Sequence, residues 1–564
     1  MSRYAVGVDF GTESGRAVLV DVANGRELAS AVHRYANGVI DKHLPAPDDD
    51  VRLEPDWALQ DPNDYIRTFQ TTVPSLLTQT GVDARDVVGV GVDFTACTML
   101  PTTADGVPLC EVAEYRRRPH AWVKLWKHHA AQPEADRINA LARERGEAWL
   151  PLYGGRISSE WFYSKSLQIL DEDPDLYRAA GRLIEAADWV VWQLTGIETR
   201  NSCTAGYKAI WSKSAGFPEP DYFAGLDPRF ATIVDDKMSR DVMPIGRRAG
   251  VLTEQAAAWT GLRPGTAVAV ANVDAHVSVP AVTVTEPGRM VAVMGTSICH
   301  MVLGERPAVV EGMCGVVEDG ILPGLFGFEA GQSAVGDIFA WFVDHAVPPS
   351  YHVAAAAAGT DVHTVLAAEA ARLRPGESGL LALDWWNGNR SILVDVDLTG
   401  VLVGATLATR APEIYRALIE ATAFGTRMIV DSFEAAGVAV NDIVTCGGLP
   451  ERNPLLMQIY ADVTGRELSM GESAQAPALG SAMFGAVAAG SAAGGYDSIG
   501  DAAACMAHVR PKVYRPNAAD HGVYDELFAE YRELHDYFGR GSNDVMKRLK
   551  SIRARTLTAA PMAS

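Results

Sequence analysis

Residues 4–21 read YAVGVDFGTESGRAVLVD, two apolar runs joined by a turn of glycines, hydroxyls and an acid. The runs at residues 4–10 and 16–22 predict two β-strands, and Asn24-Gly25 then predicts a tight hairpin into a third strand over residues 26–35. A turn that leads from strand to strand excludes a Rossmann loop and a Walker A loop, because each needs a helix after its glycines. The chain therefore begins with a three-stranded meander whose first turn is rich in glycine.

A second copy of this unit occurs at residues 288–305, GRMVAVMGTSICHMVLGE. Repetition of the strand-turn-strand unit predicts an internal duplication. Helical stretches alternate with strands in both halves, the clearest being a helix expected over residues 411–436 with Gly437 as its stop. We therefore expect an α/β fold of two domains, residues 1–283 and 284–564, each with a mixed sheet and facing across a catalytic cleft.

Length and composition agree with a folded two-domain enzyme. The 564 residues exceed what one hydrophobic core supports, and the hydrophobic (48%) and charged (21%) fractions are typical of globular proteins. A formal net charge of −21 would repel nucleic acids and anionic lipid surfaces, so we expect neither nucleic acid nor membrane as a partner. Seven scattered cysteines without a CxxC pair, and the lack of a signal or spanning segment, predict a cytoplasmic protein.

Two turns carry residue types that suit phosphate binding. The first turn and its flanks contain Asp9, Gly11, Thr12, Glu13, Ser14 and Arg16, and the second contains Gly295, Thr296 and Ser297. Backbone N–H groups of such turns can surround phosphate oxygens, and a carboxylate at the strand end can hold a hydrated magnesium ion. Either turn alone would also suit an ordinary glycine-rich hairpin. Together they predict ATP and Mg²⁺ as ligands, with one turn at each end of the triphosphate.

Two further segments complete a kinase-like set. Gly447 and Gly448, followed by Asn453, suit a flat adenosine resting on backbone without side chains, although a plain strand-to-helix turn would look the same. Asp274 lies in the apolar stretch ANVDAHVSVPA just before the expected domain boundary. A carboxylate at the floor of the cleft can accept the proton of a substrate hydroxyl as that hydroxyl attacks the γ-phosphoryl group.

With these motifs the chain resembles the FGGY carbohydrate kinases over nearly its whole length. That family is a branch of the actin and hexokinase superfold, so the resemblance implies two ribonuclease H-like domains. It also implies that Asp9 binds magnesium through water and that Asp274 is the general base, placed next to the same metal. The Gly295 turn would be the second phosphate loop, and Gly447, Gly448 and Asn453 the adenosine site.

Longer strings resemble one branch of the family, distinct from its glycerol and xylulose kinases. They are GVDFTACTMLP (91–101), LWKHHAAQ (125–132), YGGRISSEW (153–161), AGYKAIW (205–211), DWWNGNRS (384–391) and IYRALIEATAFGTR (414–427). This branch implies phosphorylation of the terminal hydroxyl of L-ribulose in L-arabinose catabolism. Another kinase of the family, acting on D-ribulose, xylulose or a pentitol, stays open, as does a sugar-binding regulator without turnover; the presence of both Asp9 and Asp274 argues against the regulator.

The resemblance also implies a sugar pocket. Its expected residues are Asp93, Ala96, Cys97, Lys208, Asp274 and Glu329. A charged pair at the pocket rim would give directional hydrogen bonds to hydroxyls, but Lys208 and Glu329 would equally suit a structural ion pair. Around Lys165 the family usually has Pro-Lys and then a Trp-containing stretch, whereas this chain reads FYSKSLQIL, which leaves the role of Lys165 open. The sequence is compatible with a homodimer.

Overall fold

The N-terminal meander forms three antiparallel strands, β1 (Tyr4–Phe10), β2 (Ser14–Asp21) and β3 (Glu27–Arg34), in the computed structural model, which describes residues 2–559. The β2–β3 connection differs from the predicted two-residue turn. The N–H of Asp21 donates to the carbonyl of Arg26 and closes a four-residue loop, in which Gly25 alone has a positive φ, +70°. The Asp21 carboxylate accepts the N–H of Ala23, and this bond holds the wider loop.

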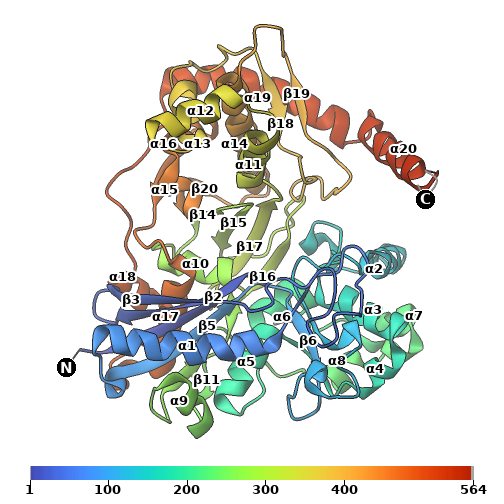
Figure 1. The fold of residues 1–564 in the computed structure, drawn as a ribbon, viewed down its shortest axis with the longest axis vertical. Helices are drawn as coiled ribbons and strands as arrows, with labels where there is room; N and C mark the ends of the chain where they lie inside the picture. The colour runs from blue at the N-terminus through green and yellow to red at the C-terminus, as the bar shows by residue number, and fades with distance from the viewer. Residues whose placement is uncertain (1, 560–564) are drawn as a thin grey trace.

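The meander is part of a mixed sheet in what we call the N-terminal lobe, the lower body in Figure 1. The strand order is β11-β12-β5-β1-β2-β3, with β13 also paired to β5. The central pair β1 and β5 is parallel, as is β5 with β12. The strands not yet given are β5 (Val87–Phe94), β11 (Arg248–Val251), β12 (Ala267–Ala269) and β13 (Asn272–Val273).

The C-terminal lobe, the upper body in Figure 1, repeats this plan. Its sheet has the order β16-β17-β15-β14-β20-β21, in which β14 pairs antiparallel with β15 and parallel with β20. Thus β14, β15, β17, β20 and β21 repeat β1, β2, β3, β5 and β12, which confirms the internal duplication. The strands are β14 (Gly288–Met294), β15 (Ile298–Gly304), β16 (Gly315–Glu318), β17 (Phe326–Gln332), β20 (Val440–Cys446) and β21 (Glu467–Met470).

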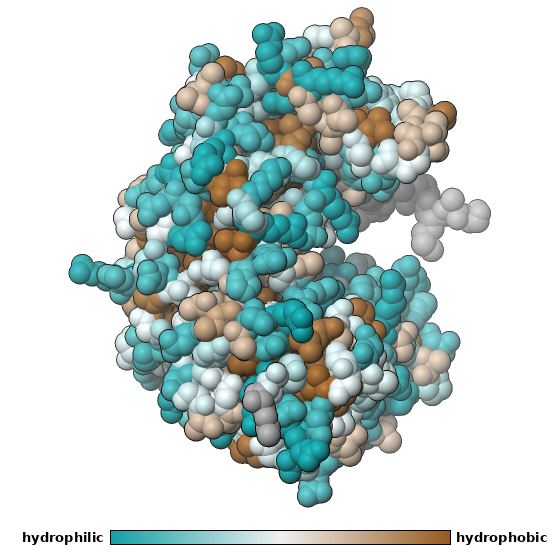
Figure 2. Space-filling view, turned by 90° about the vertical axis from the view of Figure 1, so that its left-hand side faces the viewer, coloured by the Kyte–Doolittle hydropathy of each residue, from teal (hydrophilic) through white to brown (hydrophobic). Residues whose placement is uncertain are grey.

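Shorter strands form small accessory sheets. They are β4 (Leu59–Gln60), β6 (Met99–Thr102), β7 (Val123–Lys124) and β8 (Arg182–Glu185) in one sheet, β9 (Arg200–Asn201) with β10 (Val242–Met243), and β18 (Leu381–Leu383) with β19 (Val401–Val403). Figure 2 shows the two lobes from the side, with the outline narrowing between them and polar residues over most of the visible surface.

Helices cover both sheets, and none in residues 2–559 is long and apolar enough to cross a membrane. Before the second meander they are α1 (Pro62–Thr80), α2 (Gln132–Arg145), α3 (Phe162–Glu172), α4 (Pro174–Ala179), α5 (Ala186–Thr195), α6 (Ser202–Ala209), α7 (Pro220–Leu226), α8 (Ile233–Lys237), α9 (Glu254–Thr260) and α10 (Asp274–Ala281). After it they are α11 (Gly336–His345), α12 (Pro349–Ala358), α13 (Val362–Ala370), α14 (Ala411–Ala435), α15 (Gly448–Arg452), α16 (Pro454–Thr464), α17 (Ala476–Ala489), α18 (Ile499–Met506), α19 (Ala518–Gly539) and α20 (Val545–Ala559). The helix predicted over residues 411–436 is α14, and Gly437 follows it with φ +78°.

Helix α17 joins the two halves of the chain. It belongs to the C-terminal half of the sequence, yet it packs against β1 and β5 of the N-terminal lobe and against α10. Side chains alternate along a strand, so one face of β1 carries Val6, Val8 and Phe10, which pack under α1 and α5, and the other face meets α17. The boundary expected at residues 283/284 lies between the last strand of the first sheet and the first strand of the second. Helix α17 nevertheless comes after that boundary and packs on the first sheet.

The contact with α17 needs glycines on the strands. A Cβ on Gly7 would overlap the carbonyl of Ala478, and a Cβ on Gly91 would overlap the carbonyl of Ser481. Both glycines have negative φ, so the requirement comes from the close approach of two backbones and not from an unusual backbone conformation.

We expect Gly91→Ala to destabilise the protein by about 1–3 kcal/mol, because the new methyl group must push α17 away from β5. Gly522→Ala is the matched control: its Cβ would meet nothing within 4 Å, and it lies inside α19, where alanine favours the helix by about 0.5–1 kcal/mol. Thermal unfolding of both variants measures this. A Gly91→Ala variant with an unchanged melting temperature would show that the packing of α17 on β5 does not require a residue without a side chain at position 91.

Candidate functional site

The first predicted phosphate turn connects β1 to β2 with its donors available. The N–H of Gly11 donates to the carbonyl of Ser14 at 3.0 Å and closes the turn, while the N–H groups of Thr12 and Glu13 meet no acceptor in the described part of the chain. The Trp126 indole N–H donates to the Thr12 hydroxyl (3.0 Å), and the Gln60 amide donates to the Thr12 carbonyl (2.7 Å). The turn is thus held from the side and presents two free backbone donors.

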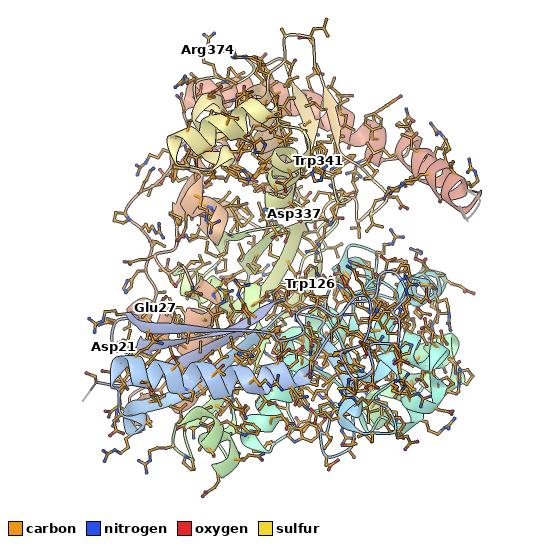
Figure 3. All side chains as sticks on the ribbon, viewed as in Figure 1. Asp21, Glu27, Trp126, Asp337, Trp341 and Arg374 are labelled. Carbon is orange, nitrogen blue, oxygen red and sulfur yellow. The ribbon has the colours of Figure 1, made fainter. Side chains whose placement is uncertain are left out.

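The second turn repeats this arrangement between β14 and β15. The N–H of Gly295 donates to the carbonyl of Ser297 at 2.9 Å, and the carbonyls of Gly295 and Thr296 accept N–H groups from the start of α11. Within residues 2–559, the N–H groups of Thr296 and Ser297 have no acceptor. Figure 3 shows Trp126 at the upper edge of the N-terminal lobe and Asp337, in the first turn of α11, above it on the C-terminal lobe.

The ends of β1 and β5 bring two carboxylates together. Asp9 and Asp93 are partners in the parallel ladder and lie on the face that meets α17, where the Ser481 hydroxyl donates to Asp93 at 2.6 Å. Burial raises the pKa of Asp9, although Arg16, whose Nε lies 3.2 Å from Asp9 Oδ2, opposes the rise. Burial and then the charge of Asp9 raise the pKa of Asp93 well above its ordinary value. The pair therefore favours a shared proton or a nearby cation.

Asp274 is the third carboxylate of this region. It is the first residue of α10, directly after β13, which pairs with the end of β5, and its Oδ1 accepts the N–H of Ala275 at 2.7 Å. Burial and the negative charge of Asp9 raise the pKa of Asp274 to about 7, and Glu329 adds to the rise while Lys208 opposes it. Its carboxyl can therefore gain or lose a proton near neutral pH.

The chemistry of these oxygens fits magnesium. Asp93 Oδ1 is buried and has no hydrogen-bond partner within the described residues, and Asp9 lies beside it. No set of three or more ligating side chains among residues 2–559 is arranged to hold a metal ion on its own. Mg²⁺ is usually bound through one or two carboxylates together with waters and substrate phosphates, so the residue types present here fit that ion.

The segment predicted to bind adenosine connects β20 to two helices. Gly447 has φ +98°, and a Cβ there would overlap the carbonyl of Met294, so only glycine lets β20 end this close to β14. A Cβ on Gly448 would meet nothing within 4 Å, which leaves open space over the backbone. Asn453 Oδ1 caps α16 by accepting the N–H of Leu456 at 3.0 Å. Its role in nucleotide binding stays a prediction.

Lys208 and Glu329 form a buried ion pair between the lobes. Lys208 lies in the last turn of α6 in the N-terminal lobe and Glu329 on β17, with Nζ–Oε distances of 3.2 and 3.3 Å. His276 Nε2 lies 3.3 Å from Glu329 Oε2, and the Lys208 ammonium lies 5.5 Å from the ring centroid of Trp161. Burial opposes the charge of Glu329, but Lys208 and His276 hold its pKa well below the ordinary value. The pair is charged at neutral pH.

The other predicted sugar residues follow β5. Ala96 is partly exposed, whereas Cys97 is buried with φ +61°, so the turn presents mainly backbone. Lys165, buried in α3, donates to the carbonyls of Cys97 (2.6 Å) and Leu125 (2.7 Å), and burial lowers its pKa to about 8. Asp93 has no exposed surface and lies next to Asp9 in the parallel ladder. Its contact with the sugar stays a prediction.

Sequence reasoning missed His276 and Trp161 and left Lys165 without a role. The position of Lys165 inside the largely apolar run FYSKSLQIL could have indicated that it is buried. A buried ammonium group needs hydrogen-bond acceptors in fixed positions. His276 stands two residues after Asp274, but nothing in the sequence shows that it turns toward Glu329 from another lobe. A separate hollow of about 610 Å³, lined by Ile245, Leu322 and Ile499 among others, contains none of the predicted site residues.

Comparison with known proteins gives matches along almost the whole chain. Residues 4–279 match the N-terminal domain, and residues 290–489 the C-terminal domain, of the FGGY family of carbohydrate kinases. Ribulokinase from Anoxybacillus flavithermus is 59% identical over 548 residues, 97% of each chain, and ribulokinase from Halalkalibacterium halodurans is 58% identical over 553 residues, 98% of each chain.

Solved structures share the fold. The crystal structure of xylulose kinase from Rhodospirillum rubrum superposes with a TM-score of 0.75 at 22% identity, covering 94% of this chain and 98% of that one. This likeness confirms the predicted α/β fold class with two mixed sheets.

Replacing Asp274 should change stability in a pH-dependent way. The folded carboxyl, with pKa about 7, binds its proton more tightly than the unfolded one, so ionised Asp274 lowers stability as pH rises from about 4 to 7. Asp274→Asn should therefore raise the melting temperature, and the gain should grow from pH 5 to pH 7 and then level off.

Asp83→Asn is the control of opposite sign, because hydrogen bonds from Arg85 lower the pKa of the exposed Asp83 to about 2. That variant should not gain stability at any pH in this range. A gain for Asp274→Asn that is the same at pH 5 and pH 8 would contradict the raised pKa.

Proposed function

The chain belongs to the FGGY family of carbohydrate kinases, and we propose that it transfers the γ-phosphoryl group of ATP to the terminal hydroxyl of L-ribulose, giving ADP and L-ribulose 5-phosphate. The observation that carries this proposal is the identity of 58–59% with ribulokinases over nearly the full length of both chains. The branch that the sequence strings resemble is that of the ribulokinases, as predicted. The reaction is a phosphotransfer to an alcohol and a step of L-arabinose catabolism.

Asp274 is the proposed general base. A base works best when its pKa lies near the working pH, and the pKa of Asp274 is about 7 because of burial and the charge of Asp9. Asp274 takes the proton of the sugar hydroxyl as the new bond from that oxygen to the γ-phosphorus forms and the bond to the β,γ-bridging oxygen breaks. The leaving ADP carries the electron pair of the broken bond.

The two duplicated turns are the proposed phosphate site. Free N–H groups of Thr12 and Glu13 in one lobe, and of Thr296 and Ser297 in the other, supply four donors for phosphate oxygens. Asp9 and Asp274 would hold the hydrated magnesium ion that accompanies ATP; when bound, this ion neutralises charge on the β- and γ-phosphates. Gly11, Ser14 and Arg16 shape the first turn, and Gly447, Gly448 and Asn453 would receive the adenosine.

The sugar would lie between Asp274 and the Lys208–Glu329 pair. An ammonium donates and a carboxylate accepts, so the pair can bond to both functions of neighbouring hydroxyls. Ala96 and Cys97 would contribute backbone from the turn that Lys165 fixes. The charged pair joins residues of different lobes, which couples sugar binding to the position of the lobes. We further propose that the enzyme works in the cytoplasm and forms a homodimer.

The substrate is tested by a coupled ADP-release assay with ATP and Mg²⁺ against L-ribulose, D-ribulose, D-xylulose, L-xylulose, ribitol and glycerol. We expect the highest kcat/KM on L-ribulose and no turnover when EDTA removes the metal. A higher kcat/KM on another of these compounds would leave the proposed mechanism standing but would change the proposed substrate. Absence of turnover on all of them would favour a sugar-binding regulator.

Asp274→Asn should lower kcat by about a hundredfold to ten-thousandfold, the range expected when a general base is lost. Sugar binding measured by calorimetry should survive, because the amide keeps the shape of the side chain. Asp344→Asn, on the exposed side of α11, is the matched control and should leave kcat unchanged. Near-normal turnover by Asp274→Asn would remove Asp274 from the mechanism.

A further inference from the structure

The β16–β17 hairpin belongs to the C-terminal sheet but rests on α6 of the N-terminal lobe. The two elements are in contact, and Figure 1 shows β16 beside α6 at the level where the lobes meet. The Ser202 hydroxyl, at the start of α6, donates to the carbonyl of Asp319 in the hairpin turn at 3.0 Å. The Lys213 ammonium, which follows the helix, lies 2.7 Å from the Asp319 carboxylate. The hairpin turn is therefore fixed to the N-terminal lobe from both sides of α6.

Tyr207 of α6 enters a socket of glycines on this hairpin. The tyrosine is fully buried. A Cβ on Gly315 would overlap Cδ1 of its ring, a Cβ on Gly320 would overlap Cε2, and a Cβ on Gly327 would overlap its hydroxyl oxygen. None of the three glycines has a positive φ, so the space for the ring, and not a special backbone conformation, requires glycine there. The hairpin is thus shaped around one aromatic side chain of the other lobe.

The Tyr207 ring stands beside Glu329. Gly315 and Glu329 are partners in the antiparallel β16–β17 ladder, and Gly327 is two residues before Glu329 on β17, so the three positions face the same side of the sheet. The Cβ positions of such partners lie about 4.5–5.5 Å apart. Because position 315 has no side chain, the Tyr207 ring occupies the place next to the Glu329 side chain. The ring therefore forms a wall of the space in which the Glu329 carboxylate lies.

Both partners of the Glu329 carboxylate also lie against the ring. The imidazole of His276 stacks on it, with 4.5 Å between the ring centroids and 17° between the planes, and the Lys208 ammonium lies 5.7 Å from its centroid. Lys208 is the next residue of α6, and His276 follows Asp274 by two residues in α10. Tyr207 thus connects the hairpin that carries Glu329 with the two helices that carry Lys208 and Asp274.

We propose that Tyr207 is a positioning residue for sugar binding. Its ring holds the hairpin at a fixed distance from α6 and thereby places the Glu329 carboxylate against Lys208, in the geometry that would meet the sugar hydroxyls. This role rests on the proposed function, because the Lys208–Glu329 pair is where the sugar would lie. Tyr207 acts through that pair and not by touching the sugar, since the tyrosine has no exposed surface.

The ring carries this role, and the hydroxyl does not. The Tyr207 hydroxyl is buried and has no hydrogen-bond partner within residues 2–559. A buried hydroxyl without a partner lowers stability, so its removal should not destabilise the protein. Tyr207→Phe should therefore bind L-ribulose as the wild type does and unfold at the same or a higher temperature.

Tyr207→Leu removes the ring and keeps an apolar side chain. Because Glu329 then loses its fixed position, the KM for L-ribulose, and the Kd of L-ribulose measured by calorimetry without nucleotide, should rise by about 10- to 150-fold, the range for losing a hydrogen bond to a charged group. The value of kcat should change much less than this KM, because the pair supports sugar binding. The KM for ATP should stay near that of the wild type, because the socket contains no residue of either phosphate turn.

Tyr222→Leu is the matched control. Tyr222 is a buried tyrosine of α7 in the same lobe, and its ring packs on Trp149 and Phe223. This variant should lower the melting temperature, as Tyr207→Leu does, and leave both sugar constants unchanged. An equal rise of the sugar KM in both variants would overturn the proposal. So would a rise of the KM for ATP in Tyr207→Leu that matches the rise for L-ribulose, because the ring would then be a general packing residue.

Gly315→Ala disturbs the same contact from the hairpin. The three atoms nearest to its new Cβ all belong to Tyr207, so the ring would have to move, and the KM and Kd for L-ribulose should rise. Combined with Tyr207→Leu, the same substitution should add little, because both changes act on one contact. A full additional effect in the double variant would contradict the socket. Gly315→Ala alone serves as the test if Tyr207→Leu does not fold.

The same assays separate the two possible failures. A wild type that phosphorylates L-ribulose, with unchanged sugar KM and Kd in folded Tyr207→Leu and Gly315→Ala, would overturn the positioning role alone. A wild type without turnover of L-ribulose would overturn the proposed function, and the positioning role for this sugar with it.

Discussion

The backbone contact between α17 and the glycine-lined face of β1 and β5 fixes how the two halves of the molecule meet. Gly7 and Gly91 let the helix approach until its carbonyls would touch a Cβ, and no larger residue fits. Because α17 follows the C-terminal sheet in sequence but packs on the N-terminal one, the contact locks the chain across both lobes.

The same contact sets the electrostatics of the site. Asp9 and Asp93 continue the strand faces that carry Gly7 and Gly91, so both carboxylates lie where α17 excludes water. Arg16 pairs with Asp9, and Asp274 adds a third acid whose pKa rises to about 7. Burial and then the negative charge of Asp9 raise the basicity of Asp274, and the excess of negative charge would also attract the cation that an ATP-dependent transfer needs. One arrangement thereby serves both metal binding and proton transfer.

Local patterns could be predicted from the sequence, and contacts between distant segments could not. The two strand-turn-strand units, the helix ending before Gly437 and the acid Asp274 within an apolar segment each follow from a short stretch of residues. The prediction of a two-residue turn between β2 and β3 was wrong. The Asp21 carboxylate accepts the N–H of Ala23, and this bond competes with the tight hairpin that Asn24-Gly25 favours. The place of α17 and the bond from Lys165 to the Cys97 carbonyl depend on residues far apart in the chain.

A crystal structure with L-ribulose, Mg²⁺ and a non-hydrolysable ATP analogue tests the account most directly. The account predicts the sugar between the lobes, its terminal hydroxyl within about 2.6–3.2 Å of Asp274 and in line with the γ-phosphorus, and phosphate oxygens at the N–H groups of Thr12, Glu13, Thr296 and Ser297. A terminal hydroxyl that meets a different carboxylate, or phosphates that bypass both turns, would contradict it.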